Sequence, residues 1–325
     1  MTRWTTSNIP SQHGRTAVVT GTGGLGLADA LALAHAGARV IVAGRNAAKG
    51  ADAVRRIHSE APRADIRFEM LDLADLASVA AFAERLREDQ ECLDLLVNNA
   101  GVMVPPRRQV TADGFELQFG TNYLGHFALT AHLLPLLRKG KQARVVSVSS
   151  IVAARGAIDF DDLDAQQRYR PMAVYAQSKI ACLIFAFELQ RRSDAAGWGI
   201  ASIAAHPGVA RTDLLHNGPG RGSVQGRIRS FLPFLFQPVE RGALPTLFAA
   251  TSAQARPGGY YGPDGLAEVR GYPTVAKVPP LALDAATATR LWEVSEALAG
   301  VTFEQAIGAS APLRHTGETA SSPAA

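Results

Sequence analysis

Tyr175 and Lys179 stand four positions apart in the run Val-Tyr-Ala-Gln-Ser-Lys at residues 174–179. Residues four apart lie on one face of a helix, so the ammonium of Lys179 can approach the phenol of Tyr175. A nearby positive charge stabilises the phenolate, which lets a tyrosine exchange a proton with a substrate oxygen near neutral pH. Because surface helices show this spacing by chance, with the lysine simply solvated, the pair indicates proton transfer only together with other motifs.

A glycine-rich run, Thr-Gly-Thr-Gly-Gly-Leu-Gly, occupies residues 20–26. Between a strand and a helix, glycines let backbone N–H groups approach a pyrophosphate, and the helix N-terminus favours its negative charge. Gly21, Gly23 and Gly26 match the general dinucleotide fingerprint. The run therefore predicts a phosphate-binding turn, and the alternative is a tight turn with a purely structural role.

The end of the second expected strand bears on the choice between NAD and NADP. An acidic residue at this point would bind a ribose 2′-hydroxyl, whereas an arginine accommodates a 2′-phosphate. The sequence has Arg45 here, with Lys49 one turn along and no carboxylate between them. We therefore expect NADP(H) in preference to NAD(H); the alternative is a solvent-facing arginine before a helix. Asp72, after the third strand, can accept a hydrogen bond from the adenine amino group or simply begin a helix.

Strand-like and helix-like segments alternate along the chain. This alternation predicts an α/β fold: a single Rossmann-like, doubly wound parallel sheet with helices on both faces and a C-terminal substrate-lid extension. We expect one domain over residues 14–308, with an N-terminal extension at 1–13, a lid at about 213–238 and a flexible tail at 309–325. The expected strands are residues 16–20, 39–43, 66–71, 93–97, 144–148 and 200–205, and the expected helices are 25–36, 47–58, 75–87, 121–137 and 172–192.

Composition limits the functional classes. The 325 residues are 47% hydrophobic and 19% charged, as in ordinary globular proteins. The amino terminus has no apolar stretch typical of a secretory signal, and no run of eighteen apolar residues occurs, so we expect no membrane span. The two cysteines, Cys92 and Cys182, suit a reducing compartment, and we therefore expect a cytoplasmic protein. A net charge of +4 from scattered arginines does not favour nucleic acid. The histidines show no paired metal spacing, so no metal site is expected, and His126 and His206 are interpreted as structural.

Read together, the motifs resemble those of the short-chain dehydrogenase/reductase family over residues 14–212. They are Gly21 to Gly26, Asp72-Leu73, Asn98-Asn99-Ala100-Gly101, Asn122, Ser149-Ser150, Tyr175 to Lys179 and Pro207-Gly208. Within the family, the chain is most similar to the branch of retinol dehydrogenases and light-dependent protochlorophyllide reductases. The cues for this branch are residues 43–46, residues 121–127 and a long spacer around 159–163 before the tyrosine.

The resemblance implies a role for each matching residue. Tyr175 would give a proton to a ketone or take one from an alcohol, and Lys179 would also hold the nicotinamide ribose. Ser150, rather than Ser149, would hydrogen-bond the substrate oxygen, and Asn122 would anchor a water linked to Lys179. The implied cofactor-binding residues are Gly21, Gly24, Leu25, Gly26, Arg45, Asp72, Leu73, Asn99, Ala100, Gly101, Tyr175, Lys179, Pro207, Val209 and Thr212.

Two features qualify these assignments. The glycine loop is one residue shorter than the usual family pattern, so Gly21, Gly24 and Gly26 are its natural counterparts. The serines and asparagines also have structural interpretations, since such residues satisfy backbone groups at strand ends and turns.

The resemblance implies an NADP(H)-dependent oxidoreductase that interconverts a carbonyl and an alcohol. The segment Phe-Leu-Pro-Phe-Leu-Phe at 231–236 lies where the family places its lid and suggests a bulky apolar ketone, aldehyde or alcohol as substrate, with Leu266, Val269 and Val278 completing the wall. The alternative is that the phenylalanines of 231–236 belong to the core or to a partner surface. Reduction of a carbon–carbon double bond and non-catalytic NADP sensing are the alternative functions. Relatives dimerise through the helices of Asn122 and Tyr175, which leaves a homodimer open unless the spacer covers that face.

Overall fold

The computed structural model describes residues 3–210 and 237–308. Its strands form one sheet in the order β3-β2-β1-β4-β5-β6-β7-β8, and all pairs are parallel except β7 with β8. This order confirms the predicted doubly wound fold and places a topological switch point between β1 and β4. The strands are β1 (Thr16–Thr20), β2 (Arg39–Gly44), β3 (Ile66–Met70), β4 (Leu95–Asn98), β5 (Arg144–Val148), β6 (Ala201–Ala205), β7 (Tyr260–Pro263) and β8 (Pro273–Val275).

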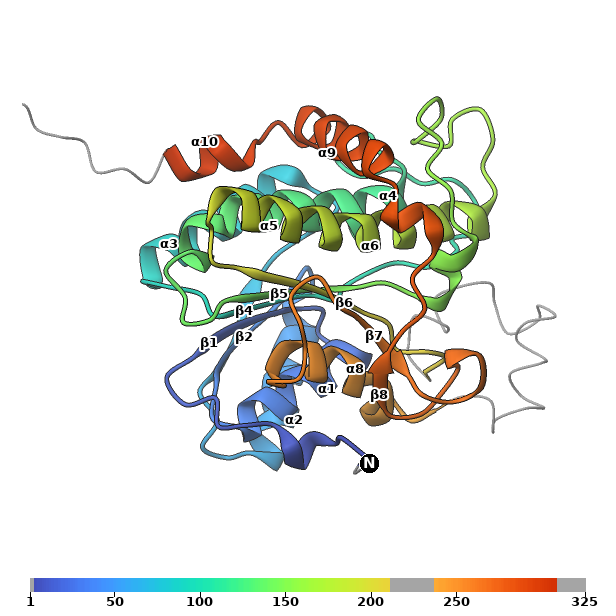
Figure 1. The fold of residues 1–325 in the computed structure, drawn as a ribbon. Helices are drawn as coiled ribbons and strands as arrows, with labels where there is room; N and C mark the ends of the chain where they lie inside the picture. The colour runs from blue at the N-terminus through green and yellow to red at the C-terminus, as the bar shows by residue number, and fades with distance from the viewer. Residues whose placement is uncertain (1–2, 211–236, 309–325) are drawn as a thin grey trace, which may run out of the picture.

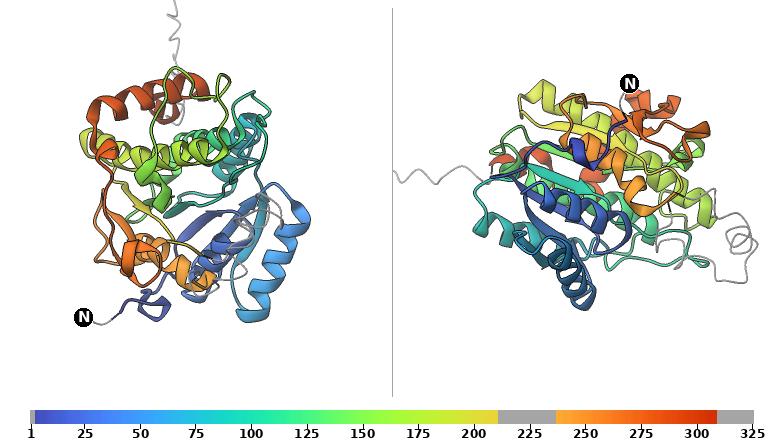
Figure 2. Two further views of the ribbon diagram at one scale, coloured as in Figure 1. Left: turned by 90° about the vertical axis from the view of Figure 1, so that its right-hand side faces the viewer. Right: turned by 90° about the horizontal axis from the view of Figure 1, so that it is seen from below.

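Helices cover both faces of the sheet (Figures 1 and 2). The central strands are apolar without alternation because both of their faces are buried, and every residue of β1 and β4 is buried. One layer holds α1 (Gly24–His35), α2 (Ala47–Glu60) and α8 (Val239–Thr251), and the other holds α3 (Leu76–Asp89), α5 (Gly125–Leu137) and α6 (Pro171–Ala196). The short elements are η1 (Thr6–Asn8), α4 (Leu117–Phe119), the π-helical turn η2 (Gly120–Leu124), η3 (Ile151–Arg155), η6 (Leu266–Glu268) and η7 (Pro280–Leu283).

Two further helices, α9 (Ala285–Ala299) and α10 (Phe303–Gly308), lie on the outer side of α5 and α6 (Figure 1). They bury an aromatic cluster in which the ring centroids of Trp292 and Phe303 are 4.4 Å apart and Phe127 of α5 lies 5.1 Å from Trp292. The C-terminal helices therefore cover this face, and the spacer before Tyr175 packs beside them, with Arg290 of α9 4.1 Å from the centroid of the Phe160 ring. Contacts of Arg108 with Asp164, at 2.8 Å, also dock the spacer against the segment before α4.

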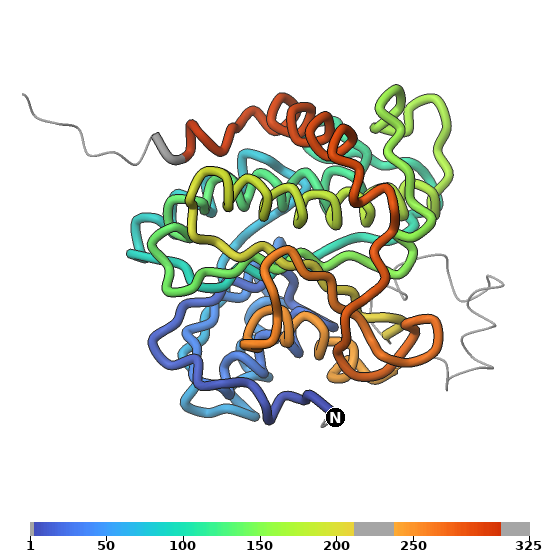
Figure 3. Tube along the Cα trace, viewed as in Figure 1, coloured from blue at the N-terminus to red at the C-terminus, as the bar shows by residue number. Residues whose placement is uncertain are grey.

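The N-terminal segment packs against the domain. The rings of Trp4 and Phe248 meet edge to face at 5.4 Å, and the N–H of Gln12 bonds to the carbonyl of Ala36 at 2.8 Å. Arg3 lies over the ring of Tyr272, so the start of the chain runs beside the segment with β7 and β8 (Figure 3). Most of the expected lid at 213–238 and the expected tail at 309–325 lie outside the described residues.

Helix α6 is long and apolar enough to cross a membrane by length and composition, with a mean hydropathy of 1.4 in its most apolar window. The sequence, read strictly, has no run of eighteen apolar residues, but this average criterion is met. Within the fold, 83% of that window is buried, because α6 packs between the sheet and α9. The helix is therefore accounted for as a core helix.

Candidate active site

Tyr175 and Lys179 lie on the buried side of α6, at the carboxyl end of β5. They are 7% and 5% exposed, and the Lys179 Nζ is 6.0 Å from the centroid of the Tyr175 ring. The same Nζ donates a 3.0 Å hydrogen bond to the carbonyl of Val148, the last residue of β5. This bond fixes the ammonium beside the phenol, so the structure brings the two residues together as the spacing predicts.

The two serines after β5 differ in their surroundings. Ser149 is buried, and its hydroxyl donates to the carbonyl of Lys179 at 2.7 Å, which ties the strand end to α6. Ser150 is half-buried, begins η3 and only accepts a long bond of 3.4 Å from the N–H of Val152. In the described part of the chain the Ser150 proton has no acceptor, so Ser150 is the serine with a hydroxyl to offer a substrate.

Asn122 sits in the π-helical turn, where the N–H of Gly125 reaches back five residues to the carbonyl of Gly120. Its Oδ1 accepts from the N–H of Val102 at 2.7 Å, and its Nδ2 donates to the carbonyl of Val102 at 3.0 Å. A Cβ on Gly101 would stand 2.9 Å from that Oδ1, so only glycine lets the turn approach Asn122 so closely. Asn122 thus clamps the turn that the sequence places at the adenosine ribose.

The turn from β1 to α1 fits a pyrophosphate. Gly21 has a φ of +102°, and a Cβ on Gly26 would lie 2.6 Å from the carbonyl oxygen of Gly21. Gly23 caps α1 without any side-chain hydrogen bond, so the first N–H groups of this helix are available to an anion. Leu25 lies in the first turn, half-buried against Gly242 of α8.

Arg45 and Asp72 follow the ends of the neighbouring strands β2 and β3. Arg45 is exposed and has no hydrogen-bond or ion-pair partner within the ranges that the structure describes. Asp72 is half-buried, and its Oδ1 accepts from the N–H of Ala74 at 3.0 Å, which leaves one carboxyl oxygen for other partners. Leu73 is buried in the core. Arg45 is therefore a free cation at this edge that could meet a 2′-phosphate.

The turn after β6 is held by the segment between β7 and β8. Gly208 has a φ of +63°, and a Cβ on it would lie 2.3 Å from the carbonyl of Val269, to which the N–H of Val209 bonds at 2.8 Å. His206 Nε2 lies 2.9 Å from Glu268 Oε2 and ties the same segments together. Thr212 lies outside the described residues.

The expected substrate wall is only partly assembled by the described residues. Leu266 is 95% exposed, whereas Val278 packs against the core. Val269 is half-buried and bonds to the turn after β6. The segment 231–236 lies outside the described residues.

A family model described as short chain dehydrogenase matches residues 15–219. The chain belongs to the short-chain dehydrogenase family. It is 40% identical to retinol dehydrogenase 13 of Mus musculus over 298 residues, covering 89% of this chain and 84% of that protein. It is 43% identical to polyprenol dehydrogenase of Mus musculus over 252 residues, covering 76% and 74%. A solved structure of Pseudomonas aeruginosa RhlG in an NADP active-site complex is 25% identical, covers 77% of this chain and 94% of that chain, and has a TM-score of 0.61.

As a short-chain dehydrogenase, the protein is an oxidoreductase of CH–OH and C=O groups that uses a nicotinamide cofactor. The cradle between β1 and α1 and the cluster of Ser150, Tyr175 and Lys179 meet at the same carboxyl edge of the sheet. That edge is where open α/β sheets bind their ligands.

Sequence reasoning missed several residues that support this dehydrogenase site. Ser178 accepts from Asn122 Nδ2 at 3.0 Å, and the thiol of Cys182 lies 3.2 Å from the carbonyl oxygen of Asn122. Thr20 and His126 are joined by a 2.9 Å hydrogen bond at the base of the site. The available signal was helical spacing: Ser178 and Cys182 flank Lys179, and His126 follows Asn122 by four residues.

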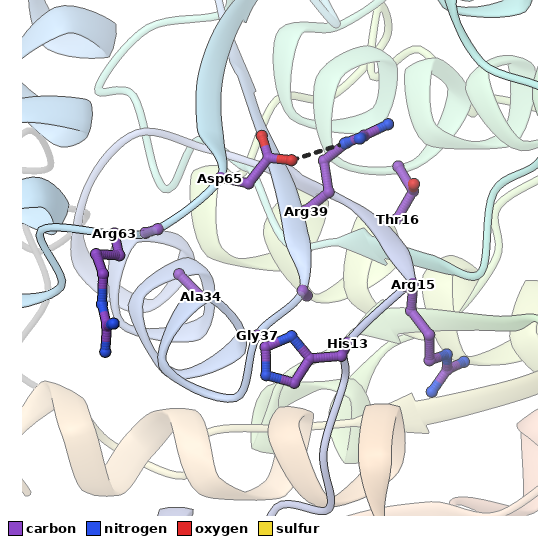
Figure 4. Close-up of a pocket in the computed structure, with 11 residues that line it drawn as sticks. His13, Arg15, Thr16, Ala34, Gly37, Arg39, Arg63 and Asp65 are labelled. Atoms are coloured by element: carbon purple, nitrogen blue, oxygen red, sulfur yellow. Dashed lines mark hydrogen bonds and ion pairs between the residues drawn. The ribbon is translucent and has the colours of Figure 1, made fainter.

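One cavity of about 360 Å³ lies away from this dehydrogenase site, at the amino ends of β1 and β2 (Figure 4). Thr16 and Arg39, which begin these strands, line it together with His13, Arg63 and Asp65, and Arg39 pairs with Asp65 at 2.9 Å. Because Tyr175 lies at the opposite edge of the sheet, this cavity takes no part in the candidate active site.

Proposed function

We propose that the protein is an NADP(H)-dependent dehydrogenase that interconverts a bulky apolar alcohol with its aldehyde or ketone. The observation that carries the proposal is the meeting of Ser150, Tyr175 and Lys179 at the edge where the glycine turn leaves helix N–H groups free. This combination supplies an anion site and a proton donor at the same carboxyl edge of the sheet.

The side chains have complementary tasks in this reaction. A reduced nicotinamide cofactor, held by the glycine turn between β1 and α1, would supply the hydride for the carbonyl carbon. The Tyr175 hydroxyl gives its proton to the carbonyl oxygen while the Ser150 hydroxyl donates a hydrogen bond to the same oxygen. Lys179, held by Val148, stabilises the phenolate that remains. Oxidation of the alcohol uses the same groups in reverse.

NADP(H) is the cofactor that the charges favour. Arg45 and Lys49 are both exposed at the start of α2, and no carboxylate stands between them. A 2′-phosphate would meet two cations here, whereas the 2′-hydroxyl of NAD(H) would find no acidic partner. The RhlG relative, whose solved structure is a complex with NADP, supports the same choice.

The apolar substrate is supported by the named relatives. The proteins that are 40% and 43% identical to this chain are a retinol dehydrogenase and a polyprenol dehydrogenase. Both names specify an alcohol at the end of a long unsaturated hydrocarbon. We propose a substrate of the same chemistry, which suits the aromatic and aliphatic residues at 231–236 of the sequence.

The test is consumption of NADPH with a panel of apolar aldehydes and ketones, a panel of enones and a small polar aldehyde, with the products identified by mass spectrometry. Conversion of long apolar aldehydes to alcohols, with little turnover of the polar one, is the expected result. Products that keep the carbonyl but lose the double bond would replace this proposal with double-bond reduction. Tight NADPH binding without turnover of any compound would indicate a sensor.

A further inference from the structure

His126, in the first turn of α5, uses both ring nitrogens in buried hydrogen bonds. Its Nδ1 lies 2.9 Å from the carbonyl oxygen of Asn122, and its Nε2 lies 2.9 Å from Thr20 Oγ1. The residue is 4% exposed. One imidazole therefore joins the end of β1, where the glycine turn starts, to the π-helical turn that carries Asn122.

The partners of the ring fix the position of its proton. A carbonyl oxygen only accepts, so the Nδ1 of His126 carries the proton toward Asn122. Burial lowers the pKa of His126 to about 4, with the charge of Lys179 as a lesser cause in the same direction. The ring is therefore neutral at physiological pH and has a single N–H. Its Nε2 must accept, and the hydroxyl of Thr20 donates.

Thr20 holds the first half of the turn at residues 99–102. Its Oγ1 accepts from the N–H groups of Asn99 and Ala100, both at 2.9 Å. These two bonds occupy the lone pairs of the hydroxyl, and its only proton points to His126. The carbonyl of Val97 is a competing acceptor at 3.2 Å. Without the imidazole the hydroxyl would turn to Val97, and its lone pairs would turn away from the two amides.

Asn122 holds the second half of the same turn through both polar groups of Val102. The carbonyl of Asn122 receives the N–H of His126 and the thiol of Cys182. The turn is thus held at one end by Thr20 and at the other by Asn122, and His126 connects the two holders. The contacts form a closed ring around residues 99–102.

We propose that His126 is a positioning residue that couples the turn at residues 99–102 to Asn122. The inference rests on the proposed function and on the family resemblance, which implies that this turn lines the adenosine ribose and that Asn122 anchors a water linked to Lys179. Loss of the imidazole loosens both holders, so it weakens cofactor binding and lowers turnover together. If His126 merely filled the core, its replacement would change the stability of the fold and leave the Kd for NADPH and kcat unaltered.

The first test is a double-mutant cycle between the two sides of the buried hydrogen bond. His126→Leu and Thr20→Val each remove one side and keep apolar volume, and each should raise the Kd for NADPH about three- to tenfold. The double variant should bind NADPH more weakly than either single variant, but by less than the product of the two losses. The bond between Thr20 and His126 is lost in all three variants, whereas the bonds of Thr20 to the turn and of His126 to Asn122 are each lost with one side chain. Thr251→Val, which removes a buried intrahelical bond from α8, is the control and should leave this Kd unchanged. Multiplied losses in the double variant, or an unchanged Kd in His126→Leu, would overturn the proposal.

The second test separates the two ends of the imidazole and covers the case in which His126→Leu fails to fold. In His126→Asn the side-chain amide takes the position of Nδ1, so it keeps the bond to Asn122 and loses the bond to Thr20. We expect a raised Kd for NADPH with kcat close to that of the wild type. Equal losses of kcat in His126→Asn and in a folded His126→Leu would contradict separate roles for the two nitrogens, in which Nε2 supports cofactor binding through Thr20 and Nδ1 supports turnover through Asn122.

A third measurement needs no cofactor. Amide hydrogen exchange in the free protein should speed up at Ala100 and, to a smaller extent, at Asn99 in His126→Asn, because the N–H of Asn99 also bonds to the carbonyl of Val97 at 3.1 Å. The amides of β5 and β6 should keep their rates. Unchanged exchange at Ala100 and Asn99 in a folded variant would refute the inference. A wild-type protein that binds no NADPH would instead refute the proposed function, so the two failures are distinguishable.

Discussion

The hydroxyl of Tyr123 donates a 2.6 Å hydrogen bond to the Oγ of Ser295, which ties α9 to the π-helical turn. The direction follows from the second bond of Ser295, whose own proton goes to the carbonyl of Leu291 at 2.6 Å. Burial raises the pKa of Tyr123, so its hydroxyl stays protonated. A helix near the end of the described chain therefore anchors the neighbour of Asn122.

Removing either side of this bond should have unequal effects on stability. Ser295→Ala leaves the Tyr123 hydroxyl buried without an acceptor, and we expect it to lower the free energy of unfolding by about 1–3 kcal/mol. Tyr123→Phe removes the hydroxyl and leaves Ser295 bonded to Leu291, so its loss should be smaller, about 0.5–1.5 kcal/mol. Urea denaturation of both variants measures the difference. Equal losses would show that the phenol finds another acceptor.

Tyr175→Phe should separate cofactor binding from turnover. The change keeps the ring and removes only the hydroxyl that we assign to proton transfer, so kcat should fall about 10²- to 10⁴-fold. The Kd for NADPH should stay within about twofold of the wild-type value, because no phosphate or adenine contact is changed. Tyr169→Phe is the matched control. Tyr169 precedes α6 in the sequence, and its hydroxyl bonds to the carbonyl of Pro105, so loss of this hydroxyl should leave turnover unchanged. Near-full activity of Tyr175→Phe would remove the basis of the proposed mechanism.

Arg45→Ala should discriminate between the two nicotinamide cofactors. Loss of a cation that meets a phosphate costs about 1.5–3 kcal/mol, so the KM for NADPH should rise about tenfold or more, while the KM for NADH changes little. Arg56→Ala removes the same charge from an exposed position on α2 and serves as the control. Parallel losses for both cofactors would assign Arg45 a role other than 2′-phosphate binding.

The strands β1 to β6 could be predicted from the sequence because the central ones are short apolar runs between turns, whereas β7 and β8 were not among the expected strands. The expected strand at 144–148 coincides with β5, and the expected helix at 47–58 lies within α2. The pairing of Tyr175 with Lys179 was equally accessible, since it depends only on helical spacing. Such features are local, and local geometry is what spacing encodes.

The remaining features depend on contacts between distant segments. Thr20 and His126 are 106 residues apart, and their hydrogen bond exists only because β1 and α5 meet at the carboxyl edge of the sheet. The packing partner of the aromatic face of α9 cannot be recognised from the sequence, because the surface that it covers forms only when α5 and α6 pack side by side. Neither relation leaves a pattern along the sequence, so only the folded structure reveals them.

Asp29 of α1 is fully buried, and neither of its carboxyl oxygens has a hydrogen-bond partner in the described part of the chain. Burial raises its pKa well above its usual range. The unfolded chain therefore releases this proton at lower pH than the folded protein does. We compare the free energy of unfolding with that of a protein that has a non-titrating residue at position 29. Below the unfolded pKa of about 3.9, ionisation of Asp29 does not lower this free energy. As the pH rises from there toward the folded pKa, ionisation of the unfolded chain lowers it progressively.

Asp29→Asn should therefore stabilise the protein in a pH-dependent manner. The amide has nearly the same size and cannot ionise, so we expect a gain of about 1–3 kcal/mol near neutral pH that shrinks toward zero near pH 4. Urea denaturation at several pH values measures this gain. Asp52→Asn on the exposed face of α2, where the carboxylate contacts Arg55, is the control and should show no comparable gain. A gain for Asp29→Asn that is the same at pH 4 and at pH 7 would mean that the buried carboxyl does not ionise on unfolding as argued, because only the ionisation of the unfolded chain makes the difference depend on pH.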